Sequence, residues 1–381
     1  MRFRVLAFVV VLFIMSASSP ITSSMYMQVD ANHVLAQSIS PSGRFLPGFV
    51  YDPINDRIMM FGGGNDDDVY DDTWILDYTT GDWIELVLDS SPVHRSSTVM
   101  VYNSADEVII LFGGHNGTEW DSDTWVFDCN TETWTDVTPA HSPYGRGSHA
   151  MVYDSINDKV LLFSGYGSIG PEIADTWAYD YNTNTWEEMN PSTSPGQRYG
   201  AGYVFDEGNG TMIIFGGNSH GHYSDTWRYN YATDTWTEFS PTDNPGALKW
   251  SVMTYDSVND KSILFGGDID YPLVANGTWI FDSANGQWGE REPTIAPISR
   301  EAFGFAFDPV NEKAVLFGGT EGANVFYNDT WSYDYDTNTW VELEQTIHTT
   351  QMGLDPIVLI TVTIFAVVVL IIGVVYFKRR T

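Results

Sequence analysis

Short apolar runs of about five residues recur along most of the chain, and turns rich in Asn, Asp and Gly separate them. In one representative unit, residues 153–186, the aliphatic run 159–163 is followed by a variable loop and by a second run at 176–180. Short runs of β-branched and aromatic residues between such turns predict β-strands joined as antiparallel hairpins. No stretch of this region keeps an apolar period of 3.6 residues, so we expect no helices there.

The same unit occurs six times, with steps of 50 to 52 residues between copies. A phenylalanine closes each aliphatic run, and two tryptophans nine residues apart follow it in every copy. Repetition at this period indicates a repeat array. The phenylalanines are Phe61, Phe112, Phe163, Phe215, Phe265 and Phe317, and the tryptophan pairs are Trp74 and Trp83, Trp125 and Trp134, Trp177 and Trp186, Trp227 and Trp236, Trp279 and Trp288, and Trp331 and Trp340.

Each unit contains four strand-like runs, and six such units predict an all-β, six-bladed β-propeller over residues 44–343. A single blade cannot bury both of its faces, so its neighbours must cover them and the ring must be complete. The landmarks divide the region into blades at about 44–90, 91–141, 142–193, 194–243, 244–295 and 296–343.

The chain resembles the kelch-repeat family, whose propellers include the central domain of galactose oxidase. Besides the spaced tryptophans, the glycine pairs carry this resemblance, and we expect a structural role for both. Two copies depart from the pattern: repeat three has Ser164 before Gly165, and repeat five has Asn276-Gly277 before its threonine. The pairs are Gly62 and Gly63, Gly113 and Gly114, Gly216 and Gly217, Gly266 and Gly267, and Gly318 and Gly319.

The two ends of the chain predict export and anchoring. Residues 1–19 combine a basic start, eleven apolar residues and a small-residue segment, which is typical of a signal peptide, with an uncleaved anchor as the alternative. Residues 20–43 are either a leader or a strand that closes the ring. After a linker at 344–356, residues 357–377 are uncharged and long enough to span a membrane, with a buried soluble helix as the alternative. The basic tail 378–381 then places the C-terminus in the cytoplasm and the propeller outside the cell.

The net charge of −33 limits the kinds of partner that we expect the protein to bind. Binding to nucleic-acid phosphates needs a cationic surface, so nucleic acid is excluded as a partner. The single cysteine, Cys129, rules out an intramolecular disulfide. We expect no bound cofactor, although the acidic run 65–68 leaves calcium open as an alternative to a solvated turn.

One cation stands near the start of each repeat. The resemblance implies that these residues lie at the start of the innermost strand, near one mouth of the channel. Six cations around one axis would attract an anion. The alternative is structural: each cation stacks on a tryptophan or bonds the carbonyls of a neighbouring blade. The residues are Arg44, Arg95, Arg146, Arg198, Lys249 and Arg300.

The loops after the glycine positions vary in sequence, and the resemblance places them on the same face as the arginines. We call this face the loop face; its loops are 64–71, 115–122, 166–174, 218–224, 268–276 and 320–328. Variable loops on a rigid scaffold suit recognition. The aromatic contact candidates on or near this face are Tyr70, Trp120, Tyr166, Tyr223, Trp250, Tyr271 and Tyr327.

Together these features favour a membrane-anchored propeller that binds a protein or glycan ligand at the cell surface, for adhesion or envelope scaffolding. The alternative is an exported kelch-type enzyme that acts on an acidic sugar, similar to an epimerase, because a ring of arginines suits a carboxylate substrate. No catalytic triad or metal-ligand motif stands out in the sequence, so a binding module is the preferred interpretation.

Overall fold

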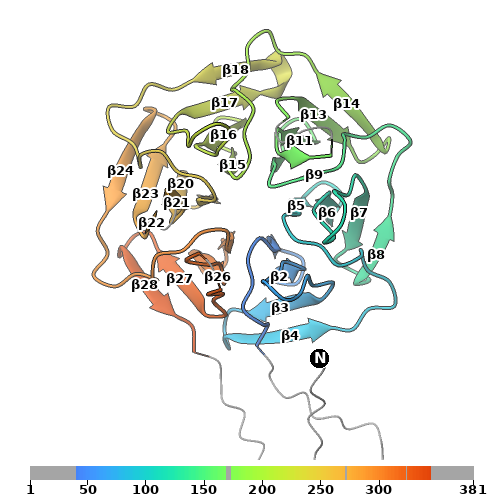
Figure 1. Cartoon of the computed structure of the whole chain (residues 1–381), viewed down its shortest axis with the longest axis horizontal. Coiled ribbons are helices and arrows are strands. Elements are labelled where there is room, and N and C mark those ends of the chain that lie inside the picture. The colour runs from blue at the N-terminus through green and yellow to red at the C-terminus, as the bar shows by residue number, and fades with distance from the viewer. Residues whose placement is uncertain (1–39, 169–172, 271–272, 323, 345–381) are drawn as a thin grey trace, which may run out of the picture. The chain divides into compact units, whose positions relative to one another are not determined.

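The computed structural model describes residues 40–168, 173–270, 273–322 and 324–344, which all belong to one compact unit of the chain (Figure 1). The predicted signal peptide, membrane helix and cytoplasmic tail lie outside the described residues. Within those ranges, no helix is both long and apolar enough to cross a membrane.

Six four-stranded antiparallel sheets stand around a common axis, which confirms the predicted six-bladed propeller (Figure 1). Each sheet has its four strands in chain order, and the first of them is nearest the axis. Blade one comprises β1 (Gly48–Asp52), β2 (Arg57–Phe61), β3 (Thr73–Asp77) and β4 (Asp82–Leu86), and blade two comprises β5 (Val99–Asn103), β6 (Val108–Phe112), β7 (Thr124–Asp128) and β8 (Thr133–Asp136).

The other four blades repeat this order. Blade three comprises β10 (Ala150–Asp154), β11 (Lys159–Phe163), β13 (Thr176–Asp180) and β14 (Thr185–Met189), and blade four comprises β15 (Gly202–Asp206), β16 (Thr211–Phe215), β17 (Thr226–Asn230) and β18 (Thr235–Glu238). Blade five comprises β19 (Val252–Asp256), β20 (Lys261–Phe265), β23 (Thr278–Asp282) and β24 (Gln287–Arg291), and blade six comprises β25 (Gly304–Asp308), β26 (Lys313–Phe317), β27 (Thr330–Asp334) and β28 (Thr339–Glu342).

Three short elements fall outside this scheme. A 3-10 turn, η1 (Tyr231–Thr233), joins the outer strands of blade four. Two small two-stranded antiparallel sheets lie on the loop face: β9 (Arg146–Gly147) with β12 (Tyr166–Gly167), and β21 (Asp268–Asp270) with β22 (Leu273–Val274).

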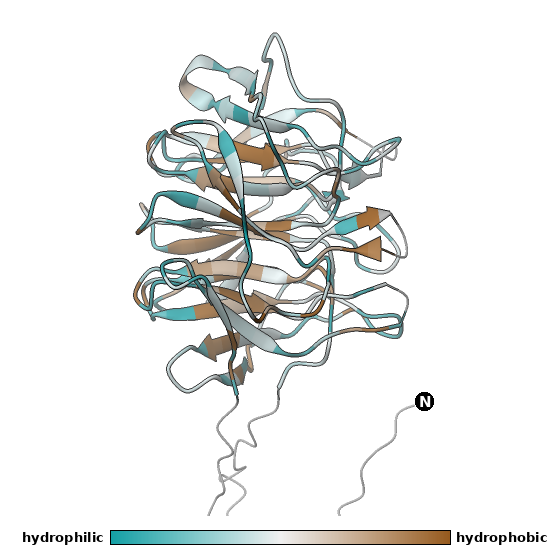
Figure 2. Cartoon of the chain, turned by 90° about the vertical axis from the view of Figure 1, so that its left-hand side faces the viewer, coloured by the Kyte–Doolittle hydropathy of each residue, from teal (hydrophilic) through white to brown (hydrophobic). Residues whose placement is uncertain are grey.

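The apolar core consists of six clusters, and each one lies between two adjacent blades. The second strand of each blade is apolar on both faces because both are covered; Ile58 to Phe61 of β2 are completely buried. Figure 2 shows the hydrophobic residues along the strands and the hydrophilic residues at the turns. The stability of each blade therefore depends on its neighbours.

The repeated phenylalanine and second tryptophan meet across every blade interface, with ring centroids 4.6–5.5 Å apart. Each of these tryptophans also donates its indole N–H to a threonine of the preceding blade, at 2.9–3.4 Å. Trp83 of blade one bonds Thr330 of blade six in this way, so the interface that closes the ring has the same contacts as the other five.

A second closed set of contacts surrounds the axis on the loop-face side. Six residues, one before each innermost strand, have a positive φ, and each donates its backbone N–H to the carbonyl of the residue in the preceding blade, at 2.6–3.0 Å. We call this set the axial ring; its members are Leu46, Ser97, Ser148, Gly200, Trp250 and Ala302. Each blade has its four strands within the described residues, and there no extra strand joins a blade: residues 40–43 belong to no sheet, and residues 20–39 lie outside the described part.

Candidate functional site

The arginine that precedes each innermost strand belongs to a three-residue unit. In blade one, Arg44 binds both carboxylate oxygens of Asp72, at 2.6 and 2.9 Å, and Asp72 accepts the indole N–H of Trp74 at 2.7 Å. Arg44 also donates to the carbonyls of Ser42 and Gly62. Its side chain is 1% exposed, so these protein groups satisfy almost all of its donors.

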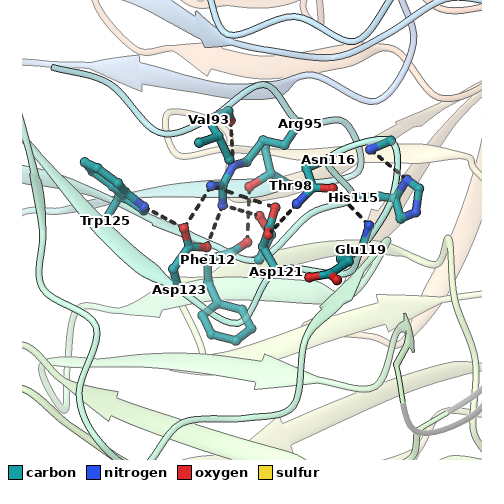
Figure 3. A network of polar contacts seen from close by, with 12 residues as sticks. Val93, Arg95, Thr98, Phe112, His115, Asn116, Glu119, Asp121, Asp123 and Trp125 are labelled. Carbon is teal, nitrogen blue, oxygen red and sulfur yellow. Dashed lines mark hydrogen bonds and ion pairs between the residues drawn. The ribbon is translucent and has the colours of Figure 1, made fainter.

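Four more blades repeat this arrangement, and Figure 3 shows it around Arg95 in blade two. Every arginine is buried, and its Nη1 lies 2.5–2.7 Å from the aspartate. Burial alone would raise the pKa values of Asp225 and Asp329, but the hydrogen bonds and positive charge of the paired arginines lower both below the usual range. The pairs are Arg95 with Asp123, Arg146 with Asp175, Arg198 with Asp225, and Arg300 with Asp329.

This geometry fits the structural alternative for the five arginines, since an aspartate compensates the charge of each. Two details differ from the expectation. The carbonyl that Nη1 binds belongs to the arginine's own blade, and the stacking partner is a tyrosine rather than a tryptophan. The guanidinium groups of Arg44, Arg198 and Arg300 lie 4.1–4.4 Å from the ring centres of Tyr70, Tyr223 and Tyr327.

Lys249 does not occupy the sixth arginine position. Leu248 does: its N–H and carbonyl make the same backbone bonds to Tyr223 and Gly217 that Arg95 makes to Tyr70 and Gly63. The aspartate of this blade is missing too, since Gly277 precedes Thr278 where an aspartate precedes the threonine in the others. The signal in the sequence was the interval from the preceding tryptophan, which is 13 residues for Lys249 but 12 for each of the four arginines that follow a tryptophan.

Lys249 therefore shares the next position with Phe45, Ser96, Gly147, Tyr199 and Glu301, whose backbones all pair with the first residues of the loops. Its ammonium group lies 3.0 Å from Oδ2 of Asp268 and 4.3 Å from the ring of Trp250. Among the six predicted cations, Lys249 is the one whose side chain is not buried.

The aromatic candidates fall into two groups. Tyr70, Tyr223 and Tyr327 are half-buried against the arginines. The other group forms a continuous row across blades two to five, with ring centroids 5.4–6.1 Å apart. This aromatic row consists of Trp120, Tyr166, Tyr199 and Trp250, and Tyr271 lies outside the described residues.

Sequence reasoning missed Tyr199, which directly follows an arginine and precedes the loops. Its place beside Tyr166 and Trp250 becomes visible only when neighbouring blades are seen together. Tyr166 is the most exposed member of the row, at 37%. The row thus places four aromatic rings side by side on the loop face, with the hydroxyl of Tyr199 accepting a hydrogen bond from Asn218.

A cavity of about 420 Å³ opens where the aromatic row ends, between blades five, six and one. Trp250, Phe45 and Phe326 supply aromatic walls, and Lys249, Asp268, Glu301 and Asp66 supply charge. Glu301 is 7% and Asp268 4% exposed, and Glu301 Oε2 and Asp268 Oδ1 have no hydrogen-bond partner among the described residues. We call this cavity the acidic pocket.

The acidic run 65–68 forms a turn, in which Asn65 Oδ1 accepts the backbone N–H groups of Asp67 and Asp68. In the part of the chain that the structure describes, no three His, Cys, Asp or Glu residues are grouped in a way that could hold a metal ion. The structure therefore gives no support to a calcium site at this turn.

Comparison with known proteins places these features in context. A family model for the KLHDC2/KLHL20/DRC7 Kelch-repeats domain matches residues 23–195 and 153–353. The chain is 31% identical over 134 residues to Mei4-dependent protein 6 of Schizosaccharomyces pombe, covering 32% of this chain and 19% of that protein.

It is also 25% identical over 212 residues to acyl-CoA-binding domain-containing protein 5 of Arabidopsis thaliana, covering 53% of this chain and 32% of the relative. A third match, at 24% identity, is the flagellar outer-arm dynein alpha chain of Chlamydomonas reinhardtii; it covers 43% of this chain and 4% of the dynein chain. The chain thus spans a third or less of the length of each of these relatives.

Proposed function

The chain belongs to the kelch-repeat family, and we propose that its propeller is an interaction module that binds a partner protein through the loop face. The observation that carries this proposal is the aromatic row. None of its four residues is one of the repeated phenylalanines, paired tryptophans, glycines or arginines of the fold. Trp120 and Tyr166 lie on the loops, and Tyr199 and Trp250 precede the innermost strands of their blades. Aromatic side chains on a rigid surface are frequent contributors to the binding energy of protein interfaces.

We further propose that the module is displayed outside the cell. The support comes from the sequence alone: residues 1–19 have the pattern of a signal peptide, and residues 357–377 have the length and flanking charge of a membrane anchor. The loop face would then meet a protein of another cell or of the same cell envelope.

The enzyme alternative is not proposed. It depended on a ring of free arginines that would hold a carboxylate substrate, whereas five arginines are already paired with aspartates inside the blades. The one thiol is also unsuited to nucleophilic chemistry, because burial and the neighbouring Asp52 raise the pKa of Cys129 far above its usual range.

Proximity crosslinking with the full-length protein in its source cell tests the interaction. The variant Tyr166→Ala removes the most exposed ring of the row, and Ile84→Ala serves as the control because Ile84 is 51% exposed on the outermost strand of blade one. We expect Tyr166→Ala to reduce recovery of the main crosslinked protein at least fivefold and Ile84→Ala to leave it unchanged. Equal recovery from both variants, or a crosslinked component that glycosidase treatment removes, would overturn the proposal.

A further inference from the structure

Blade five differs from the other blades in a way that assembles charge at the loop face. The buried arginine and aspartate of the repeated unit are replaced together by Leu248 and Gly277, so blade five lacks the buried Arg–Asp pair of the other blades. Lys249 and Asp268 instead form an ion pair at the edge of the acidic pocket, at 3.0 Å. Blade five therefore lacks the buried Arg–Asp pair and has the Lys249–Asp268 ion pair on its loop face instead.

Blade six adds a second carboxylate to the same pocket. Glu301 follows Arg300, and its backbone pairs with Thr320, which also lines the pocket. Its side chain is about as buried as that of Asp268, yet no arginine or lysine is paired with it in the described part of the chain. Burying a carboxylate oxygen without a hydrogen-bond partner is unfavourable, so this arrangement favours a ligand that supplies donors.

The charges select the kind of ligand. Lys249 contributes one positive charge, whereas Asp268, Glu301 and, at the rim, Asp66 contribute three negative charges when ionised. The pocket is therefore acidic as a whole, and it repels anions. A bare metal ion is disfavoured because the carboxylates are not grouped as metal ligands within the described residues. A cation that carries N–H donors matches the two unpaired oxygens.

The aromatic walls of the acidic pocket indicate what the uncharged part of the ligand is. Trp250, Phe45 and Phe326 surround the carboxylates with aromatic surface, which suits an aliphatic stem and a cation held against aromatic rings. A volume of about 420 Å³ lies within the usual range for a specific binding pocket, roughly 300–1,000 Å³, and exceeds the needs of an ammonium ion alone.

We infer that the acidic pocket binds a lysine or arginine side chain of the partner protein, with Glu301 and Asp268 accepting its N–H donors. This inference rests on the proposed interaction through the loop face and adds the chemistry of the contact. Because the aromatic row ends at Trp250, one extended segment of a partner could cover the row and place a basic residue in the pocket.

Binding of a basic side chain is expected to depend on pH. Burial, and next the charge of Asp268, raise the pKa of Glu301 to about 7, and Lys249 opposes this rise; Asp66 is the other charged group that lines the pocket. A cation prefers the ionised form of Glu301, and a lysine ligand keeps its charge up to about pH 10. From pH 6 to pH 8 the ionised fraction of Glu301 grows about tenfold, so the affinity should rise about tenfold.

The test uses the full-length protein in non-ionic detergent and two peptides, acetyl-Gly-Lys-Gly-amide and the same peptide with an acetylated lysine side chain. Saturation-transfer NMR at pH 6 and pH 8 reports their affinities. We expect the charged peptide to bind at least tenfold more tightly than the acetylated one at pH 8, and Glu301→Gln to abolish both this preference and the pH dependence. Glu119→Gln, the same change on an exposed loop of blade two, should alter neither.

Equal binding of the two peptides, or an unchanged preference in Glu301→Gln, would overturn the inference. The crosslinking experiment separates the two proposals. If Tyr166→Ala loses the partner but Glu301→Gln retains it, the interaction through the loop face stands and the basic contact does not. If neither variant affects the partner, both proposals fail. A melting temperature for each variant confirms that it is folded.

Discussion

At the scale of single residues, the repeated Arg–Asp–Trp unit shows how a buried charge is made tolerable. The arginine loses its water, and the aspartate and two carbonyls replace it with hydrogen bonds in fixed positions. Removing one partner of such a buried pair leaves an uncompensated charge, whereas replacing both partners with uncharged residues is often nearly neutral. Blade five has undergone the second kind of change, since Leu248 and Gly277 stand where the pair would be.

The variant Asp225→Asn is therefore expected to lower the free energy of unfolding by about 3 kcal/mol or more, because Arg198 keeps its buried charge without a counter-ion. Chemical denaturation measures this loss, and Asp89→Asn on the exposed surface is the control. The double variant Arg198→Leu with Asp225→Gly copies blade five and should be less destabilised than Asp225→Gly alone. Additive effects in this double-mutant cycle would contradict the explanation.

The residue scale also shows the limit of reasoning from the sequence. The equivalent positions of the five arginines in their repeats could be recognised, because the regularly spaced tryptophans mark each copy. Lys249 was placed one position wrong because a single extra residue before it shifts the register, and only the backbone bonds of Leu248 reveal the shift. The sequence did not predict a role for Glu301, because its place in the acidic pocket depends on Asp268 of another blade.

At the scale of the blade, the glycine pair allows two blades to approach closely on the loop-face side. Gly113 has a φ of +65°, and a Cβ atom on it would lie 2.4 Å from the carbonyl oxygen of Arg146 in the next blade. The N–H of Gly114 donates to that same oxygen at 2.8 Å. In blade three, Ser164 takes the place of the first glycine. It has a positive φ, and its hydroxyl donates to the carbonyl of Arg198 at 2.6 Å.

Alanine substitution separates backbone strain from this close approach. Gly113→Ala should destabilise the protein by about 2–5 kcal/mol, because it combines an unfavourable φ with a clash against backbone. Gly117 of the same blade has a φ of +89° but open space around it, so Gly117→Ala should cost only about 1–2 kcal/mol. Thermal unfolding of both variants gives the comparison, and equal losses would show that φ alone explains the glycine.

The strands themselves were largely predictable, because alternation of apolar runs and turn residues is a local property. The runs 159–163 and 176–180 coincide with β11 and β13. The innermost strand of that blade begins at Ala150, since Ser148 has a positive φ and belongs to the axial ring. The pairing of β9 with β12 was not predicted, since two-residue strands leave no periodic pattern.

At the scale of the whole propeller, six repeated units predict six blades, but the means of closure could not be inferred from one blade. Whether residues 20–43 supply a closing strand depends on how the last blade meets the first. The structure shows that every blade is complete, and that closure uses the same contacts as every other interface. The axial ring also closes between blades six and one, because the N–H of Leu46 donates to the carbonyl of Ala302 at 2.7 Å.

If the closing interface is equivalent to the others, it should also be equally strong. Thr330→Val removes the acceptor of Trp83 between blades six and one, and Thr124→Val removes the acceptor of Trp186 between blades two and three. Each change leaves a buried indole N–H without a partner, so each should cost about 1–3 kcal/mol. A repeat protein gains its stability from contacts between neighbours, and in a closed ring no blade is terminal. We therefore expect equal losses and one unfolding transition in both variants when heat denaturation is followed by tryptophan fluorescence. A smaller loss in Thr330→Val, or a separate early transition, would show that the ring opens first between its last and first blades.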